Sequence, residues 1–120
     1  SIRAASEMAS AMHRRLVLVL GEMREQGREA AAGHQEIGRV AAESGASVLI
    51  AVGGGSAHCM ADVAERSLPH VRFAPTVQVG LGAVLDAVSA NDLVLVKASR
   101  SVGLDRIVAE LERQHGPRRG

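Results

Sequence analysis

Short runs of branched apolar residues alternate with helical stretches along the whole chain, and this alternation constrains the fold more than any other feature. Residues 16–20, 47–52 and 93–97 are almost continuously apolar, and residues 71–74 form a shorter run after Pro69. Runs of this length are typical of strands, and continuous apolarity is typical of strands buried on both faces of a sheet.

Apolar residues at helical spacing predict five helices between and around these strands. The expected helices cover residues 2–12, 29–44, 56–66, 77–88 and 104–114. Ser1 and Thr76 are suitable N-caps, and Gly45 is a suitable stop signal. Strands that alternate with helices predict an α/β, Rossmann-like fold, with a mainly parallel sheet and helices on both of its faces.

The length of 120 residues favours one domain over residues 1–120, with an ordered core of about 1–114 and a tail of 115–120. Apolar residues make up 47% of the chain, but it has one Phe and no Trp or Tyr, so aliphatic side chains must fill the core. The single cysteine, Cys59, is expected to be a small core residue. It is consistent with a reducing, cytoplasmic environment.

Composition also excludes some partners. The 14 basic and 13 acidic residues give a net charge of +1, which provides no electrostatic footprint for DNA or an anionic membrane. The shortage of aromatic residues disfavours binding of single-stranded nucleic acid, which depends on stacking. No apolar run approaches the roughly 20 residues that cross a bilayer. We therefore expect no nucleic acid and no membrane as partners.

Ligands of parallel α/β sheets bind beyond the carboxyl ends of the strands. The loops at that edge are expected at residues 21–28, 53–56, 74–76 and 98–103. In the last of these, Lys97, Ser99 and Arg100 offer an ammonium, a hydroxyl and a guanidinium that could hold a carboxylate or phosphate. A polar turn with a serine as helix cap is the alternative.

Two other strand ends invite a functional interpretation. Glu22 could recognise an ammonium group or pair with Arg100, or it could be only a favourable charge at a helix N-terminus. The glycines at 53–55 suggest a dinucleotide turn, but their spacing is not G-x-G-x-x-G, so a simple turn is favoured. No P-loop is present, because Lys97 is the only lysine and it ends a strand. The adjacent His58 and Cys59 point in different directions on a helix and predict no metal site.

Five segments, in order, resemble the C-terminal domain of the bacterial Mur ligases, and in particular the branch that adds D-alanyl-D-alanine (MurF type). Where that branch has S-M-R-A-A, L-G-D-M-x-E-L-G, H-x-E-[IV]-G, V-K-G-S-R and L-[ED]-x-[IV]-V, this chain has SIRAA (1–5), LGEMREQG (20–27), HQEIG (34–38), VKASR (96–100) and LDRIV (104–108). Ala98 stands in place of a glycine and Glu22 in place of an aspartate.

The resemblance implies a part of an ATP-dependent ligase of peptidoglycan synthesis, and so of cell-wall formation, cell shape and cell division. ATP would activate the carboxylate of UDP-MurNAc-tripeptide, and the amine of D-alanyl-D-alanine would then form the amide bond. ATP and Mg²⁺ would be held mainly by N-terminal and central ligase domains outside this chain, without which it would be inactive.

The resemblance also assigns roles to residues, none of them catalytic. Lys97, Ser99 and Arg100 would hold the dipeptide, with Arg100 the best candidate to meet its carboxylate. The neighbouring wall would be lined by Gly21, Glu22, Met23 and His34. Ser1 would face the nucleotide. The alternative is a free-standing α/β module that binds a nucleotide or a small acid.

Overall fold

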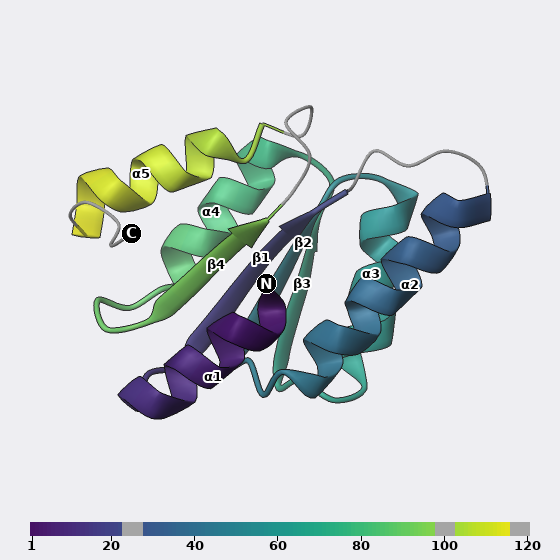
Figure 1. The fold of residues 1–120 in the computed structure, drawn as a ribbon. Coiled ribbons are helices and arrows are strands. Elements are labelled where there is room, and N and C mark those ends of the chain that lie inside the picture. The colour runs from purple at the N-terminus through teal and green to yellow at the C-terminus, as the bar shows by residue number, and fades with distance from the viewer. Residues whose placement is uncertain (23–27, 98–102, 116–120) are drawn as a thin grey trace.

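The computed structural model describes residues 1–22, 28–97 and 103–115, and for residues 28–32 and 34 it describes only the backbone. Four strands form one parallel sheet in the order β3-β2-β1-β4 (Figure 1). Their bounds are β1 Leu16–Gly21, β2 Val48–Val52, β3 His70–Ala74 and β4 Leu93–Lys97. The expected parallel sheet is confirmed.

Five helices cover the two faces of this sheet (Figure 1). They are α1 Ile2–Met12, α2 Arg28–Glu43, α3 Gly55–Glu65, α4 Val77–Ala87 and α5 Asp105–His115. The helices α1, α2 and α3 pack with the leucines of β1 on one face, whereas α4 and α5 pack with its valines on the other. Each helix lies within two residues of its predicted bounds, and the doubly covered α/β architecture is as expected.

Burial falls from the centre of the sheet to its edges. Every residue of β1 and β2 is buried, as continuous apolar runs predict for central strands. The edge strands β3 and β4 are more exposed, and β4 is half-buried over its first four residues. The helix signals are confirmed as well: Ser1 accepts a hydrogen bond from the Ala4 amide, Thr76 accepts one from the Val79 amide, and Gly45 follows α2 with a φ of 73°.

Two glycines allow close packing that the sequence does not reveal. A Cβ at Gly38 of α2 would lie 3.1 Å from Val63 Cβ of α3, and a Cβ at Gly80 of α4 would lie 2.9 Å from Val52 Cγ2 of β2. A glycine inside a helix lowers its intrinsic stability, but Gly80 allows α4 to approach the sheet closely. The expectation for Cys59 was wrong: it is half-buried on α3 and is not a member of either apolar core cluster.

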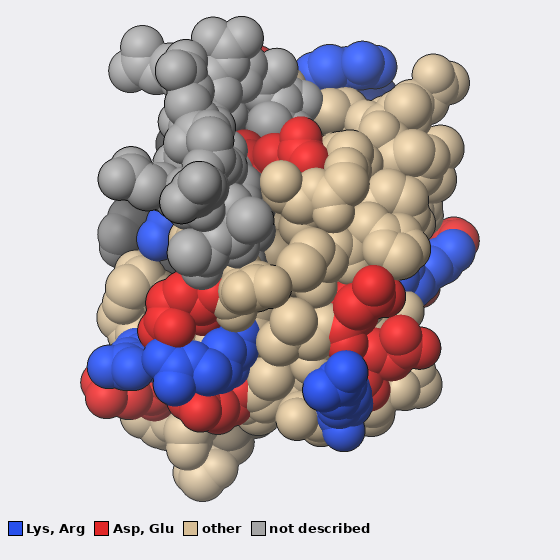
Figure 2. Space-filling model, turned by 90° about the vertical axis from the view of Figure 1, so that its right-hand side faces the viewer, with Lys and Arg blue, Asp and Glu red and all other residues tan. Residues whose placement is uncertain are grey.

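Within the described residues, no helix is both long enough and apolar enough to cross a membrane. Charges of both signs are mixed on the face that carries α2 and α3, where blue and red side chains lie next to one another (Figure 2). One such pair joins Arg39 to Glu36 at 2.6 Å; its hydrogen bond from Arg39 lowers the pKa of Glu36. Among the described side chains of this face, charges of opposite sign thus lie close together (Figure 2).

Candidate functional site

The order in which the chain adds strands to the sheet reverses between β1 and β4. From β1 the chain adds β2 and then β3 on one side, and it then crosses to place β4 on the other side of β1. The helix α2, which follows β1, covers one face, whereas α5, which follows β4, covers the opposite face (Figure 1). The chain therefore continues from β1 and from β4 to helices on opposite faces, and this is the position where parallel α/β sheets bind ligands.

This reversal brings the two predicted binding segments to neighbouring strand ends. Lys97 is in register with Leu20, the residue before Gly21. Leu20 packs on the face covered by α1, α2 and α3, and partners in parallel register point to the same face, so Lys97 projects there too. Lys97 is exposed, and it is the only lysine of the chain. An ammonium group thus stands exposed at the carboxyl edge of the sheet, next to the end of β1, where it could meet an anionic ligand.

Glu22, directly after β1, is directed to the start of α3. Its Oε1 accepts hydrogen bonds from the backbone amides of Ser56 at 3.1 Å and Ala57 at 3.4 Å. Of the interpretations open from the sequence, the charge at a helix N-terminus is the one the geometry shows, although the helix is α3 and not the one that follows Glu22. Contact with a ligand ammonium or with Arg100 stays a prediction.

The glycine turn after β2 is shaped around that carboxylate. Gly53 has a φ of 141°, which favours glycine, and a Cβ at this position would lie 2.6 Å from Glu22 Cγ. A phosphate at the N-terminus of α3 would have to displace the Glu22 carboxylate and overcome its negative charge. The turn is therefore poorly suited to bind a dinucleotide, in agreement with the simple-turn interpretation.

Ser1 lies on the same side of the sheet as Lys97. Only three residues separate α1 from β1, so α1 runs antiparallel to the strand and its first turn points toward the carboxyl ends of the strands (Figure 1). The contacts of α1 with both β1 and β4 place it over these two neighbouring strands. This orientation is consistent with the predicted nucleotide-facing position of Ser1, which stays a prediction.

Four predicted site residues cannot be placed at the level of their side chains. Met23 lies in the segment 23–27, and Ser99 and Arg100 lie in the segment 98–102, so all three are outside the described residues. His34 belongs to α2, of which it is described only as backbone. The helix α2 starts at the carboxyl edge of the sheet, and His34 lies in its first half.

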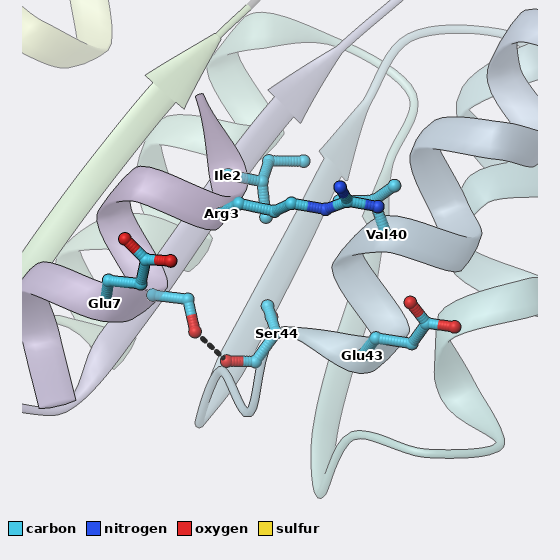
Figure 3. A pocket seen from close by; sticks show the side chains of 7 residues that line it. Ile2, Arg3, Glu7, Val40, Glu43 and Ser44 are labelled. Atoms are coloured by element: carbon cyan, nitrogen blue, oxygen red, sulfur yellow. Dashed lines mark hydrogen bonds between the residues drawn. The ribbon is translucent and has the colours of Figure 1, made fainter.

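A cavity of about 210 Å³ lies between α1 and α2 (Figure 3). Ser6 on α1 donates a hydrogen bond of 2.6 Å to the carbonyl of Ser44 at the end of α2, which ties the two helices together below it. The cavity is lined by Ile2, Arg3, Ser6, Glu7, Val40, Glu43 and Ser44. No sequence pattern indicates it, because it forms between residues about forty positions apart. Its lining has one cation and two carboxylates.

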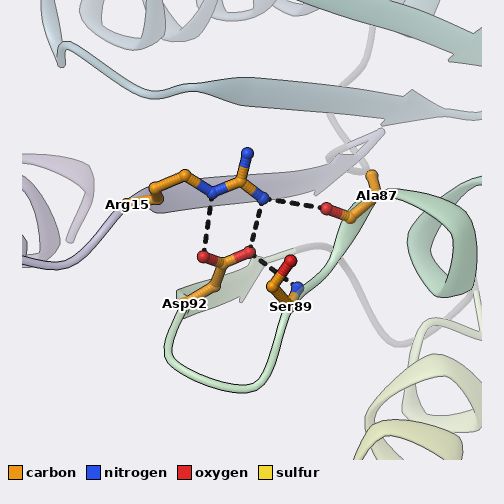
Figure 4. Close-up of polar contacts among 4 residues, drawn as sticks. All are labelled: Arg15, Ala87, Ser89 and Asp92. Carbon is orange, nitrogen blue, oxygen red and sulfur yellow. Dashed lines mark hydrogen bonds and ion pairs between the residues drawn. The ribbon is translucent and has the colours of Figure 1, made fainter.

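A polar network lies at the amino edge of the sheet, where β1 and β4 begin (Figure 4). Arg15 donates from Nε to Asp92 Oδ1 at 2.9 Å, from Nη2 to Asp92 Oδ2 at 2.7 Å, and from Nη2 to the carbonyl of Ala87 at 3.0 Å. The Ser89 amide also donates to Asp92. Burial alone would raise the pKa of Asp92, but the hydrogen bonds from Arg15 and Ser89 outweigh it and the pKa is lowered. The network lies at the edge opposite the strands' carboxyl ends, where parallel α/β sheets bind ligands, and we interpret it as structural.

The described residues contain no group of three or more His, Cys, Asp or Glu side chains that could hold a metal ion. His58 pairs with Asp62 at 3.2 Å and packs edge-on against Phe73, with ring centroids 5.1 Å apart. These contacts give His58 a packing role on the surface of α3, next to the half-buried Cys59.

Comparison with known protein families gives one match over most of the chain. The model of the family described as "Mur ligase, glutamate ligase domain" matches residues 1–100. Among curated proteins, none matches the chain significantly. The family is one of ATP-dependent amide ligases that act in peptidoglycan synthesis, and its parallel α/β domain agrees with the fold described above. The matched segment includes the sheet, the helices α1 to α4 and the carboxyl ends of β1 and β4. The chain therefore belongs to the Mur ligase family, as its C-terminal domain.

Proposed function

We propose that this chain is the C-terminal domain of the ligase that adds D-alanyl-D-alanine to UDP-MurNAc-tripeptide in the bacterial cytoplasm. The observation that carries the proposal is the reversal of strand order between β1 and β4, with Lys97 exposed beside the end of β1. In this role the domain holds the dipeptide at the carboxyl edge of the sheet and closes over ATP. The N-terminal and central domains hold the UDP-sugar, ATP and Mg²⁺.

The residues of this edge suit the recognition of a carboxylate. Lys97 supplies a mobile positive charge, and Arg100 supplies a planar pair of donors that matches a carboxylate. With Ser99, they hold the carboxylate of the dipeptide and leave its amine free to attack. Gly21, Met23 and His34 line the neighbouring wall. The domain contributes orientation and exclusion of water, and it contributes no acid, base or nucleophile.

The described residues do not fit a site for ATP and Mg²⁺ of their own. They contain no cluster of carboxylates for a metal ion, and the glycine turn before α3 already holds the Glu22 carboxylate. ATP supplies the activation of the tripeptide carboxylate. In the proposed enzyme, the N-terminal and central domains hold most of the nucleotide, and Ser1 faces it across the closed cleft.

Substitution of Lys97 in the complete ligase tests the proposal. A hydrogen bond to a charged group contributes about 1.5–3 kcal/mol, so we expect Lys97→Ala to raise the KM for D-alanyl-D-alanine about tenfold or more. The KM for UDP-MurNAc-tripeptide should change little. Arg72→Ala is the matched control, because Arg72 is an exposed cation on β3, at the other edge of the same sheet. Equal effects of the two variants on the dipeptide KM would contradict the assignment of Lys97.

Specificity needs its own experiment, because other Mur ligases add single amino acids. The complete ligase is assayed with D-alanyl-D-alanine, D-glutamate, L-alanine and diaminopimelate, each with its matching UDP-sugar precursor. Turnover with D-alanyl-D-alanine alone supports the proposal, and turnover with one of the others assigns the chain to another branch. Calorimetry on the 120-residue chain tests the free-standing module: micromolar binding of a nucleotide by this chain would favour that alternative.

A further inference from the structure

Glu22 connects two loops of the sheet that are far apart in sequence. It stands at the end of β1, and its carboxylate accepts hydrogen bonds from the first amides of α3, 34 and 35 residues later. Gly54, the residue at the N-cap position of α3, has no side chain with which to cap the helix. The first amides of a helix lack partners within it, and a negative charge there is favourable. Glu22 therefore does for α3 what a Ser or Asp cap does for other helices.

The fit depends on the length of the side chain and on the glycines around it. A Cβ at Gly53 would lie 2.6 Å from Glu22 Cγ, and a Cβ at Gly54 would lie 3.3 Å from Glu22 Oε1. The side chain thus lies against backbone from which side chains are absent. An aspartate would be shorter by one carbon–carbon bond, about 1.5 Å, and would lose both hydrogen bonds unless the backbone moved.

From this geometry we infer that Glu22 is a positioning residue, which fixes the start of the loop after β1 against the glycine turn after β2, and that it is not a ligand for the substrate amine. Under the proposed function, the segment that follows Glu22 contributes Met23 to the substrate site. Glu22 anchors the start of that segment before any substrate binds. The kinetic consequence rests on the proposed function, whereas the contact between Glu22 and α3 does not.

Nuclear magnetic resonance of the 120-residue chain tests the contact directly. Protonation of Glu22 at low pH removes the charge of the acceptor and should move the amide signals of Ser56 and Ala57. In Glu22→Gln this pH-dependent change should disappear from both amides. Glu36→Gln, which removes another acid on the neighbouring helix α2, should leave the change in place. Persistence of the change in Glu22→Gln would overturn the inference.

The activity of the complete ligase separates positioning from ligand binding. Glutamine keeps the length and an acceptor oxygen but loses the charge, whereas aspartate keeps the charge but loses the reach. For a positioning residue we expect Glu22→Gln to keep kcat/KM within about fivefold, as loss of a charge at a helix N-terminus implies. Glu22→Asp should lower kcat/KM at least tenfold, because misplacement by about 1 Å is costly.

The opposite order of activities would show that Glu22 binds the substrate amine and would overturn the positioning role. If the wild-type ligase did not turn over D-alanyl-D-alanine, only the proposed function would be contradicted. The pH-dependent change of the amide signals does not depend on the substrate. The two failures are thus distinguishable.

Discussion

Alanine at two glycines of α4 should change stability in opposite directions, although both lie inside the same helix. Gly80 faces the sheet and is buried, whereas Gly82 is exposed. In an exposed helix interior, replacement of glycine by alanine stabilises by about 0.8–1.0 kcal/mol. A Cβ at position 82 meets no atom within 4 Å, so Gly82→Ala should show this gain in full.

At position 80 the same gain is opposed by a clash. The new Cβ would lie 2.9 Å from Val52 Cγ2, and Val52 is a fully buried residue of a central strand. A β-branched side chain has little freedom to turn away. Overpacking of a core costs about 1–3 kcal/mol, so after the gain in helix propensity Gly80→Ala should be destabilised by roughly 1 kcal/mol.

Urea unfolding of the 120-residue chain, followed by circular dichroism at 222 nm, measures both variants. The two should differ by about 2 kcal/mol in the free energy of unfolding, with similar m-values. Their melting temperatures should differ by roughly 6–12 °C for a domain of this size. If Gly80→Ala were stabilised as much as Gly82→Ala, the close approach of α4 to β2 would be refuted.

Three further predictions concern the structural contacts. Arg15→Ala should lower the free energy of unfolding by about 1–2 kcal/mol, because it removes charged hydrogen bonds from the Asp92 side chain, which is only 4% exposed. The loss should not be larger, because the Arg15 side chain is 45% exposed and partly screened by water. Urea unfolding measures the change, with Arg14→Ala as the control. Because folding lowers the pKa of Asp92, its contribution to stability is present above the unfolded pKa of about 3.9 and is lost as the pH falls through the folded pKa. The free energy of unfolding of the wild type should therefore fall more steeply than that of Arg15→Ala between about pH 5 and pH 3. Parallel pH profiles would contradict the ion pair. Gly38→Ala should be less stable than its helix propensity implies, because the new Cβ would lie 3.1 Å from Val63 Cβ; a gain as large as that of Gly82→Ala would argue against close packing of α2 on α3.

The sequence determined the elements and their burial class, because these depend on local chemistry. Continuous apolar runs marked β1 and β2 as central strands, and Ser1, Thr76 and Gly45 fixed helix ends through hydrogen bonds or a backbone angle within a few residues. The ordered motifs then indicated the family, which the match over residues 1–100 shows.

The tertiary structure decided what depends on contacts between distant residues. Gly80 and Gly82 are equivalent in sequence, and only the position of Val52 makes one a packing requirement and leaves the other dispensable. Glu22 at the end of β1 had several possible partners, and the fold directs its carboxylate to the amides of α3. The strand order that places Lys97 beside β1 is likewise a choice among topologies that periodicity leaves open, because local patterns specify which face of an element is buried but not what it is buried against.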